Sequence, residues 1–207
     1  MSTKINMRKI TQEKRLLKIL EKRPMMRSRD IDALGIPPMV VLRLLKKNTL
    51  VSTGRGIVCL PEKITSEQQM LMEISLRVPH GVICLLSALR YHEIGTQNPH
   101  QIWLAIDRKA RKPRNTDTSL KIVRFSKSSL LYGVEHHNIH AIPVSITSPA
   151  KTVADCFKFR NKIGLDIALE ALREGWRERR FNSDALYRAA KVCRVEKIIR
   201  PYLEALV

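Results

Sequence analysis

Residues 27–60 constrain the fold of this chain more than any other stretch. A polar segment begins at Ser28 and ends at Gly35, and a basic segment begins at Pro37 and Pro38. Glycine adopts the positive φ with which many helices end, and proline suits the first turn of a helix. Two short apolar runs follow, at residues 50–51 and 57–60, with Ser-Thr-Gly-Arg-Gly between them. The order predicts a short helix, a turn, a second helix and a hairpin of two strands.

The basic segment, from about Pro38 to Asn48, is amphipathic when its residues are placed roughly 100° apart, as in an α-helix. One face is apolar and consists of Val40, Val41, Leu44 and Leu45. The opposite face consists of Met39, Arg43 and Lys46, with Lys47 at its edge. A helix that enters the major groove of DNA needs this division, because its outer face must offer donors to phosphates and base edges.

Before Ser28, the sequence predicts another helix, from about Thr11 to Lys22, which Pro24 ends. We expect the hydroxyl of Ser28 to cap the helix that follows. Three helices and a hairpin in this order are typical of a winged helix-turn-helix, with Arg55 at the tip of the wing. The alternative is a helical bundle with a hairpin and ordinary solvated lysines.

The formal net charge of the chain is +19, and it is unevenly distributed. Residues 1–61 have a net charge of +10 and the other 146 residues a net charge of +9, so the charge density is more than twice as high in the first part. A compact domain with such a field favours a duplex nucleic acid as partner. We expect DNA contacts from these residues: Ser28, Arg29, Met39, Arg43, Lys46, Lys47 and Arg55.

Each of these residue types suits a particular contact. The planar guanidinium of Arg43 is the candidate for reading a guanine edge with two hydrogen bonds. Lys46 and Lys47 are expected to neutralise phosphates, which raises affinity without reading sequence. We expect Ser28 and Arg29 to contact a phosphate strand, and Arg55 to act from the wing.

The remaining two thirds of the chain mix helical and strand patterns, so the fold class we predict is α+β. The expected domains are a winged helix-turn-helix at residues 1–61 and a larger α+β domain at residues 66–207. Strands are predicted near residues 101–107 and 120–125, with a turn-linked pair over 134–144. Ser148 is expected to cap a helix with Pro149 in its first turn, and final helices are predicted over 183–193 and 196–206.

The cysteines stand at positions 59, 84, 156 and 193 and show no Cys-x-x-Cys spacing. They are expected to be reduced residues of the core. No apolar stretch approaches the roughly 20 residues that span a bilayer, and the N-terminus lacks the apolar segment of a secretion signal. We therefore expect a cytoplasmic protein without a membrane partner.

Several stretches resemble a known family. They are residues 81–92 (GVICLLSALRYH), Thr96-Gln97, residues 102–106 (IWLAI) and residues 146–156 (ITSPAKTVADC). Together with the predicted winged helix, they resemble the AbiEi-type antitoxins and transcriptional regulators of type IV toxin–antitoxin systems. The resemblance implies an N-terminal domain that binds operator DNA upstream of its own operon and represses it. It also implies a C-terminal domain that counteracts a nucleotidyltransferase-like toxin without forming a stable complex with it.

Two alternatives to this function remain open. Asp107 and Lys109 end a predicted strand in an acid-x-Lys arrangement, which in nucleases holds a divalent cation, and Glu73 or Glu93 could supply a second acid. The other alternative is a protein-docking module that does not bind DNA. No Walker loop, Gly-x-Ser-x-Gly or His-Glu-x-x-His motif is present, so we expect neither catalysis nor a cofactor.

Further clusters have more than one interpretation. The loop cations Arg108, Lys109, Arg111, Lys112 and Arg114 could contact nucleic acid or remain solvated. Arg173, Arg177 and Arg180 share a helix face with interleaved glutamates, which favours a solvated face. The histidines His136, His137 and His140 could suggest zinc, but no further ligand is nearby in the sequence. Asp155 could be a catalytic carboxylate, but a carboxylate on a helix surface that pairs with Lys151, four residues earlier, fits equally well.

Overall fold

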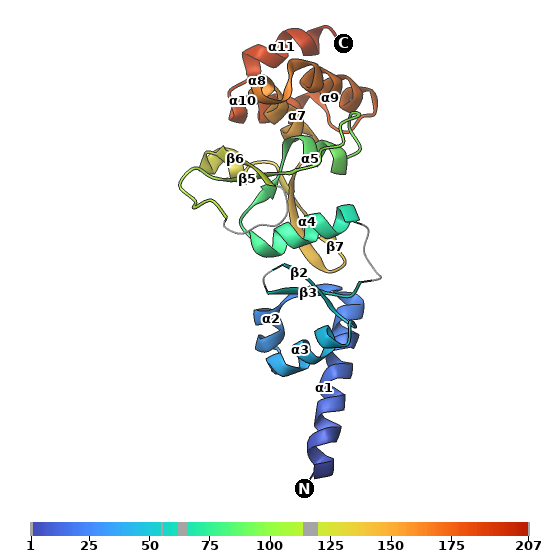
Figure 1. The fold of residues 1–207 in the computed structure, drawn as a ribbon. Coiled ribbons are helices and arrows are strands. Elements are labelled where there is room, and N and C mark those ends of the chain that lie inside the picture. Colours follow the sequence, from blue (N-terminus) through green and yellow to red (C-terminus); the bar gives the residue numbers. More distant parts are fainter. Residues whose placement is uncertain (1, 55, 62–65, 114–119, 207) are drawn as a thin grey trace. The chain divides into compact units, whose positions relative to one another are not determined.

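The computed structural model describes residues 2–54, 56–61, 66–113 and 120–206, which form a mixed α+β protein (Figure 1). The chain forms two compact units. The first consists of Met1–Pro79 and Asn138–Pro143, and the second of His80–His137 and Val144–Val207. The predicted α+β class is therefore confirmed. None of the helices in the described residues combines the length and apolar character needed to cross a bilayer.

The first unit contains helices on a small sheet. Its elements are α1 (Ser2–Lys22), β1 (Met25–Arg27), α2 (Ser28–Ala33), α3 (Pro38–Lys46), β2 (Val51–Gly54), β3 (Ile57–Cys59) and α4 (Ser66–Arg77). The strands form an antiparallel sheet in the order β1-β3-β2. In its register Cys59 lies opposite Met25 on one side and opposite Val51 on the other. The central strand β3 is buried along its whole length.

Local sequence signals account for most of these boundaries. Pro37 is the residue before α3 and Pro38 its first residue, as expected for a fixed φ and a missing N–H donor. Gly35 and Gly56 have φ of 74° and 73°, which permit the turn after α2 and the turn between β2 and β3. The helix predicted to begin at Thr11 begins at Ser2.

Two features of this unit differ from the sequence predictions. Arg27, not Ser28, precedes α2, and no side chain caps this helix, so the predicted cap at Ser28 is wrong. The backbone N–H of Ser28 instead donates to the carbonyl oxygen of Gly56 at 2.7 Å. Strand β1 was not predicted, because three residues are too few for an alternating pattern to be recognised.

Apolar residues in the described part of the first unit include these two clusters. One joins α1, α2 and α3 to the sheet through buried side chains such as Leu16, Ile31, Leu44 and Val58. The other lies between β1, β3 and α4 and includes Ile142, from the segment Asn138–Pro143. This short segment therefore belongs to the core of the first unit although it is distant in sequence.

The second unit is built on a five-stranded sheet with several helices. Its elements are β4 (Val82–Ile83), α5 (Leu85–Tyr91), β5 (Ile102–Asp107), β6 (Leu120–Phe125), α6 (Lys127–Leu131), β7 (Val134–Ile139), β8 (Ile142–Thr147), α7 (Pro149–Lys158), α8 (Arg160–Ile163), α9 (Leu165–Arg177), α10 (Ser183–Cys193) and α11 (Glu196–Glu204). The adjoining ends of β7 and β8, within Asn138–Pro143, belong to the first unit. The strand order is β6-β5-β4-β8-β7. Strands β5 and β6 are parallel, as are β4 and β8, whereas β4 and β5 are antiparallel.

Helix α7 is the central helix of this unit. The hydroxyl of Ser148 accepts a hydrogen bond from the N–H of Lys151, and Pro149 is the first helical residue, so the predicted cap is confirmed. Helices α5, α9 and α10 pack against α7, and all residues from Ala150 to Phe157 are buried. Asp155 pairs with Lys151, as one of its two interpretations held, but the pair lies in the core and not on a helix surface.

Candidate nucleic-acid interface

Helix α3 has one buried face and one exposed face. Val40, Val41 and Leu44 are buried, and they anchor the helix in the core of the first unit. On the other side Met39 is 65% exposed, and Lys46 and Lys47 are exposed as well. The structure thus has the apolar and outward-facing sides that the periodicity predicts.

The outward side of α3 also contains Leu42, which was not among the residues predicted to contact DNA. Leu42 is 51% exposed and belongs to the same turn of α3 as Met39 and Arg43. An exposed leucine beside exposed cations adds apolar surface of the kind that contacts thymine methyl groups in a major groove.

Glu13, on α1, is the partner of Arg43 on α3 and of Lys47, the residue that follows α3. Its carboxylate accepts a hydrogen bond from Arg43 Nη1 at 2.8 Å through Oε1, and Oε2 lies 3.4 Å from Lys47 Nζ. The hydrogen bond from Arg43 lowers the pKa of Glu13 below its ordinary value, with a further contribution from Lys47. The side chain of Arg43 is 36% exposed and therefore remains accessible. No local pattern predicted this contact, because the partners are 30 residues apart.

The start of α2 lies against the turn between β2 and β3. Ser28 is exposed, and its backbone N–H is bound to Gly56, which fixes this end of α2 to the hairpin. The side chain of Arg29 is 72% exposed, and its Nε lies 3.9 Å from a carboxylate oxygen of Asp30. Arg55, the predicted tip residue, lies outside the described residues.

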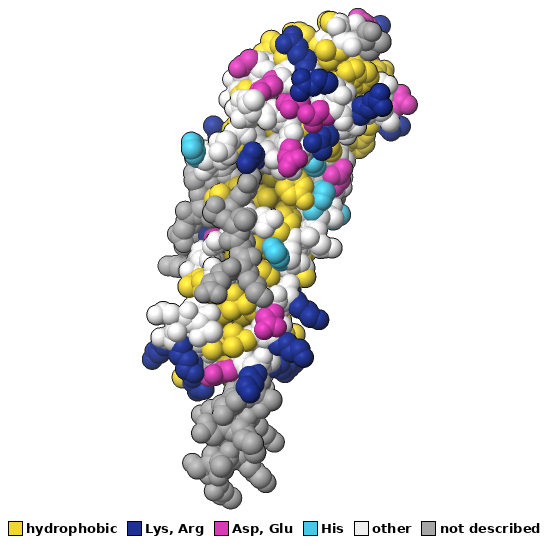
Figure 2. Space-filling view, turned by 90° about the vertical axis from the view of Figure 1, so that its right-hand side faces the viewer, with side chains coloured by type: hydrophobic (Ala, Val, Ile, Leu, Met, Phe, Trp, Pro, Cys, Tyr) yellow, Lys and Arg dark blue, Asp and Glu magenta, His cyan; other side chains and the backbone are white. Residues whose placement is uncertain are grey.

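Charged side chains of both signs are exposed on both units. Figure 2 shows dark-blue Lys and Arg side chains with magenta Asp and Glu side chains among them, over the lower part of the view and over the upper part. On α9, Arg177 Nη2 lies 4.0 Å from carboxylates of both Glu174 and Glu178. Arg180 is 3.1 Å from Glu178. Of the three arginines predicted to form a solvated helix face, Arg177 and Arg180 are therefore in exposed ion pairs.

The loop after β5 presents exposed cations on an ordered backbone. Arg108, Lys109, Arg111 and Lys112 are exposed, whereas Arg114 lies outside the described residues. Arg124 Nη1 donates to the carbonyl oxygens of Arg108, Ala110 and Asp107, at 2.7, 2.9 and 3.3 Å. In the part of the chain that the structure describes, none of the four exposed cations lies within 4.0 Å of a carboxylate.

The residues of the predicted nuclease site are engaged in other contacts. The carboxylate of Asp107 accepts the backbone N–H of Lys109 at 2.8 Å, a short turn that holds the loop. Glu73 is buried and paired with Arg77 at 2.6 Å, and Glu93 lies 3.8 Å from Arg180. Among the described residues, no group of three or more His, Cys, Asp or Glu side chains could hold a metal ion.

The histidines that suggested zinc have separate partners. His136 Nδ1 lies 3.1 Å from Ser145 Oγ, and His137 Nε2 lies 3.1 Å from a carboxylate oxygen of Glu135. His140 Nε2 lies 3.3 Å from Oε1 of Gln68. Their ring nitrogens are thus bound to different groups and do not converge on one point.

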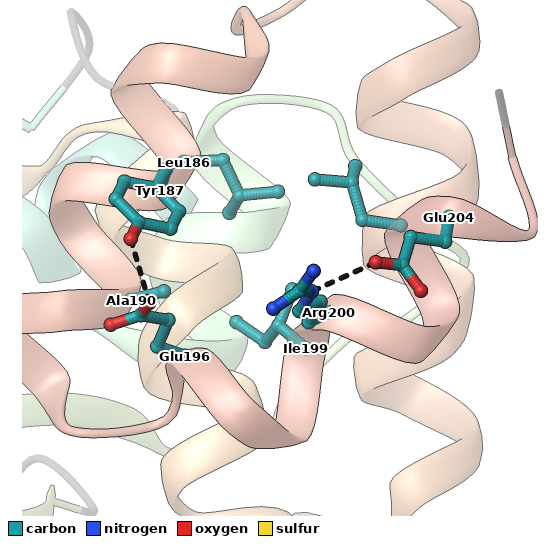
Figure 3. A pocket seen from close by; sticks show the side chains of 8 residues that line it. Leu186, Tyr187, Ala190, Glu196, Ile199, Arg200 and Glu204 are labelled. Atoms are coloured by element: carbon teal, nitrogen blue, oxygen red, sulfur yellow. Dashed lines mark hydrogen bonds and ion pairs between the residues drawn. The ribbon is translucent and has the colours of Figure 1, made fainter.

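A pocket of about 380 Å³ lies between α10 and α11 (Figure 3). Leu186, Ala190 and Ile199 supply apolar lining. Tyr187 Oη donates to Glu196 at 2.7 Å, and Arg200 Nε donates to Glu204 at 2.8 Å. Because these rim groups bind each other, none of them is a free polar group directed at a ligand.

Comparison with known proteins shows a likeness to a solved structure. No family model matches the chain, and no curated protein matches it. The crystal structure of the RV2827C protein from Mycobacterium tuberculosis is similar, with a TM-score of 0.54 and 14% sequence identity. The match covers 95% of this chain and 80% of that one. At this identity the likeness concerns the fold alone.

Proposed function

We propose that this protein is a sequence-specific DNA-binding repressor whose first unit is a winged helix-turn-helix. The element order α1-β1-α2-α3-β2-β3 and the sheet order β1-β3-β2 support this proposal, because they are compatible with a winged helix-turn-helix. In the proposal α3 is the second helix of the helix-turn-helix and the β2–β3 hairpin is the wing. The observation that carries it is the outward side of α3, where Arg43, Lys46 and Lys47 stand opposite a buried aliphatic face.

In this proposal α3 enters the major groove. The guanidinium of Arg43 binds a guanine edge, and Met39 makes an apolar contact beside it. Lys46 and Lys47 neutralise phosphates. Arg29 and the start of α2 at Ser28 contact a phosphate strand, and Arg55 extends the contact from the wing.

We further propose that the protein is the antitoxin of a type IV toxin–antitoxin system. The resemblance of residues 81–92, 102–106 and 146–156 to AbiEi-type antitoxins supports this proposal. The DNA target is then the operator upstream of its own operon, and the functional counterpart is a nucleotidyltransferase-like toxin that forms no stable complex with it. A neighbouring gene for such a toxin, whose toxicity this protein relieves on co-expression, is the expected finding.

The DNA-binding proposal is tested with the duplex upstream of the protein's own gene and a scrambled duplex of equal length. We expect fluorescence anisotropy to show tighter binding to the upstream duplex. With about six phosphates contacted, log K should fall with log salt at a slope of about −5. Equal binding to both duplexes would contradict sequence-specific recognition, and Mg²⁺-dependent cleavage lost in Asp107→Ala would support the nuclease instead.

Arg43→Ala tests base readout. The variant should lose about 1–3 kcal/mol of binding free energy on the operator and much less on scrambled DNA, because a base contact is lost. Equal losses on both duplexes would contradict this role for Arg43.

Lys46→Ala tests phosphate neutralisation. It should weaken binding to both duplexes and make the salt slope shallower by about one unit. Lys191→Ala is the matched control, since Lys191 is an exposed lysine on α10 of the second unit. A Lys46→Ala slope equal to that of the control would exclude the phosphate contact.

A further inference from the structure

The bridge from Glu13 to α3 has a consequence for how α3 distinguishes DNA sequences. The side chain of Glu13 is 18% exposed, whereas those of its partners Arg43 and Lys47 are 36% and 56% exposed. The side chain of Glu13 is therefore more covered than those of the two cations, which remain accessible from outside. Arg43 Nη1 is held at 2.8 Å in a charge-assisted hydrogen bond.

This hydrogen bond leaves the reading capacity of Arg43 largely intact. A guanidinium has five N–H donors in a planar fork, and Glu13 takes one of them. Because Arg43 is already held in the free protein, less of its rotamer freedom is lost when it meets a base. The arrangement thus favours a contact that demands fixed geometry.

The charge of Glu13 also affects contacts with phosphates, which do not require a fixed side-chain geometry. Glu13 is a carboxylate at neutral pH, as a glutamate with its ordinary pKa already is. It lies next to two cations that would otherwise be fully available to phosphates. A negative charge at this place weakens binding that depends on phosphates alone. Binding to the operator also includes the base contact of Arg43, and this contact still contributes to its affinity.

We propose that Glu13 is a specificity-determining positioning residue: it orients Arg43 toward a base edge and offsets the charge of α3 against non-cognate DNA. This inference rests on the proposed DNA-binding function. It concerns the ratio of the affinities for operator and scrambled duplex, rather than either affinity by itself.

Glu13→Ala is the principal test. We expect affinity for scrambled DNA to rise and the operator-to-scrambled ratio to fall about tenfold, which is a typical coupling between groups in direct contact. The salt slope on scrambled DNA should become steeper by about one unit, since cations of α3 become available to phosphates. The matched control is Glu21→Ala, which removes the same charge from an exposed position of α1 and should leave the ratio unchanged.

Two further variants separate positioning from a structural effect. In an Arg43→Ala background, Glu13→Ala should change the ratio no further, because the residue it positions is absent. Glu13→Gln retains an oxygen that accepts the hydrogen bond from Arg43, so it should preserve operator affinity better than Glu13→Ala while binding scrambled DNA more tightly than the wild type. Thermal unfolding of each variant verifies that it is folded.

The outcomes distinguish this inference from the function on which it rests. A wild-type preference for the operator that persists unchanged in both Glu13 variants would overturn the role of Glu13 and leave the DNA-binding function standing. A wild-type protein without any preference would overturn both. A ratio that falls equally with and without Arg43 would show that Glu13 does not act through Arg43.

Discussion

Lys151 and Asp155 form a fully buried ion pair in the core of the second unit. Lys151 Nζ lies 2.5 Å from Asp155 Oδ2 and 4.7 Å from the centre of the Phe125 ring, and Cys193 Sγ donates to Asp155 Oδ1 at 3.2 Å. Burial raises the pKa of Asp155, although the charge and hydrogen bond of Lys151 act in the opposite direction. Each charge is acceptable in the core only because the other is present.

Removing one partner of this pair should be far more harmful than removing both. We expect Lys151→Met to lower the free energy of unfolding by about 3–5 kcal/mol, since Asp155 is left buried without a counter-charge. The double variant Lys151→Met/Asp155→Leu should recover most of this loss. Urea unfolding of the two variants and the wild type measures both quantities, and a double variant as unstable as the single one would contradict the explanation.

The Lys151→Met variant should also acquire a characteristic pH dependence. Without Lys151, burial raises the pKa of Asp155 further above its ordinary value of 3.8. The folded variant then binds more protons than the unfolded chain, so its free energy of unfolding falls as pH rises from below 3.8 through the raised pKa. Urea unfolding across the acidic range should show this decrease, and a rise over the same range would contradict it.

The four cysteines should be unreactive in the folded protein. All are buried, and burial raises the pKa of each thiol, with that of Cys193 at about 12. Only the thiolate is nucleophilic, so a thiol-specific reagent at pH 8 should modify them very slowly. After addition of denaturant, all four should react. Rapid modification of the native protein would show that a thiol is accessible.

At the scale of elements, two glycine turns with similar backbone angles should tolerate substitution differently. Gly56 and Gly133 have φ of 73° and 61°, which strain any residue with a side chain. A Cβ at Gly56 would meet no atom within 4 Å, whereas a Cβ at Gly133 would lie 2.9 Å from Cβ of Lys151. The two turns therefore share the strain but not the crowding.

Gly133→Ala should consequently be the more destabilising change. We expect Gly56→Ala to lower the free energy of unfolding by about 1–2 kcal/mol from the backbone alone. Gly133→Ala should add about 1–3 kcal/mol, because the turn or the buried lysine must shift. Parallel denaturation curves test this, and equal losses would mean that the turn before β7 adapts without displacing Lys151.

For the molecule as a whole, the first unit is completed by a segment from far along the sequence. Ile142, in the segment Asn138–Pro143, is fully buried with Met25, Ile57 and Met72 of the first unit. The stability of the predicted DNA-binding domain therefore depends on residues outside the range 1–61 that the sequence assigned to it. Substitutions in this segment should therefore change the rate of hydrogen exchange at the backbone amides of β1, β3 and α4.

Ile142→Ala tests this dependence. The variant should lose about 2–5 kcal/mol of stability, as for a large aliphatic side chain truncated in a core. Hydrogen exchange should accelerate in β1, β3 and α4 of the first unit. Pro143→Ala, at the exposed neighbouring position, is the control and should change exchange little. Unchanged protection of β3 in Ile142→Ala would show that this segment does not support the first unit.

Elements with a strong local pattern could be predicted from the sequence. Helix α10 and strand β6 have the predicted bounds, Ser183–Cys193 and Leu120–Phe125, because apolar periodicity and turn residues mark them. The cap at Ser148 was predicted for the same reason, since a cap involves residues within one turn. The apolar face of α3 was also evident from residues that are three and four apart.

Contacts between distant residues could not be predicted in this way. The sequence alone determined where the helices and strands with a strong local pattern form and that α3 presents cations on one side, because these depend on neighbours along the chain. Only the tertiary structure decided that Glu13 holds Arg43, that β1 pairs with β3 and that Asp155 lies in the core. Each depends on which surfaces pack together, and an ion pair looks the same in sequence whether water or protein surrounds it.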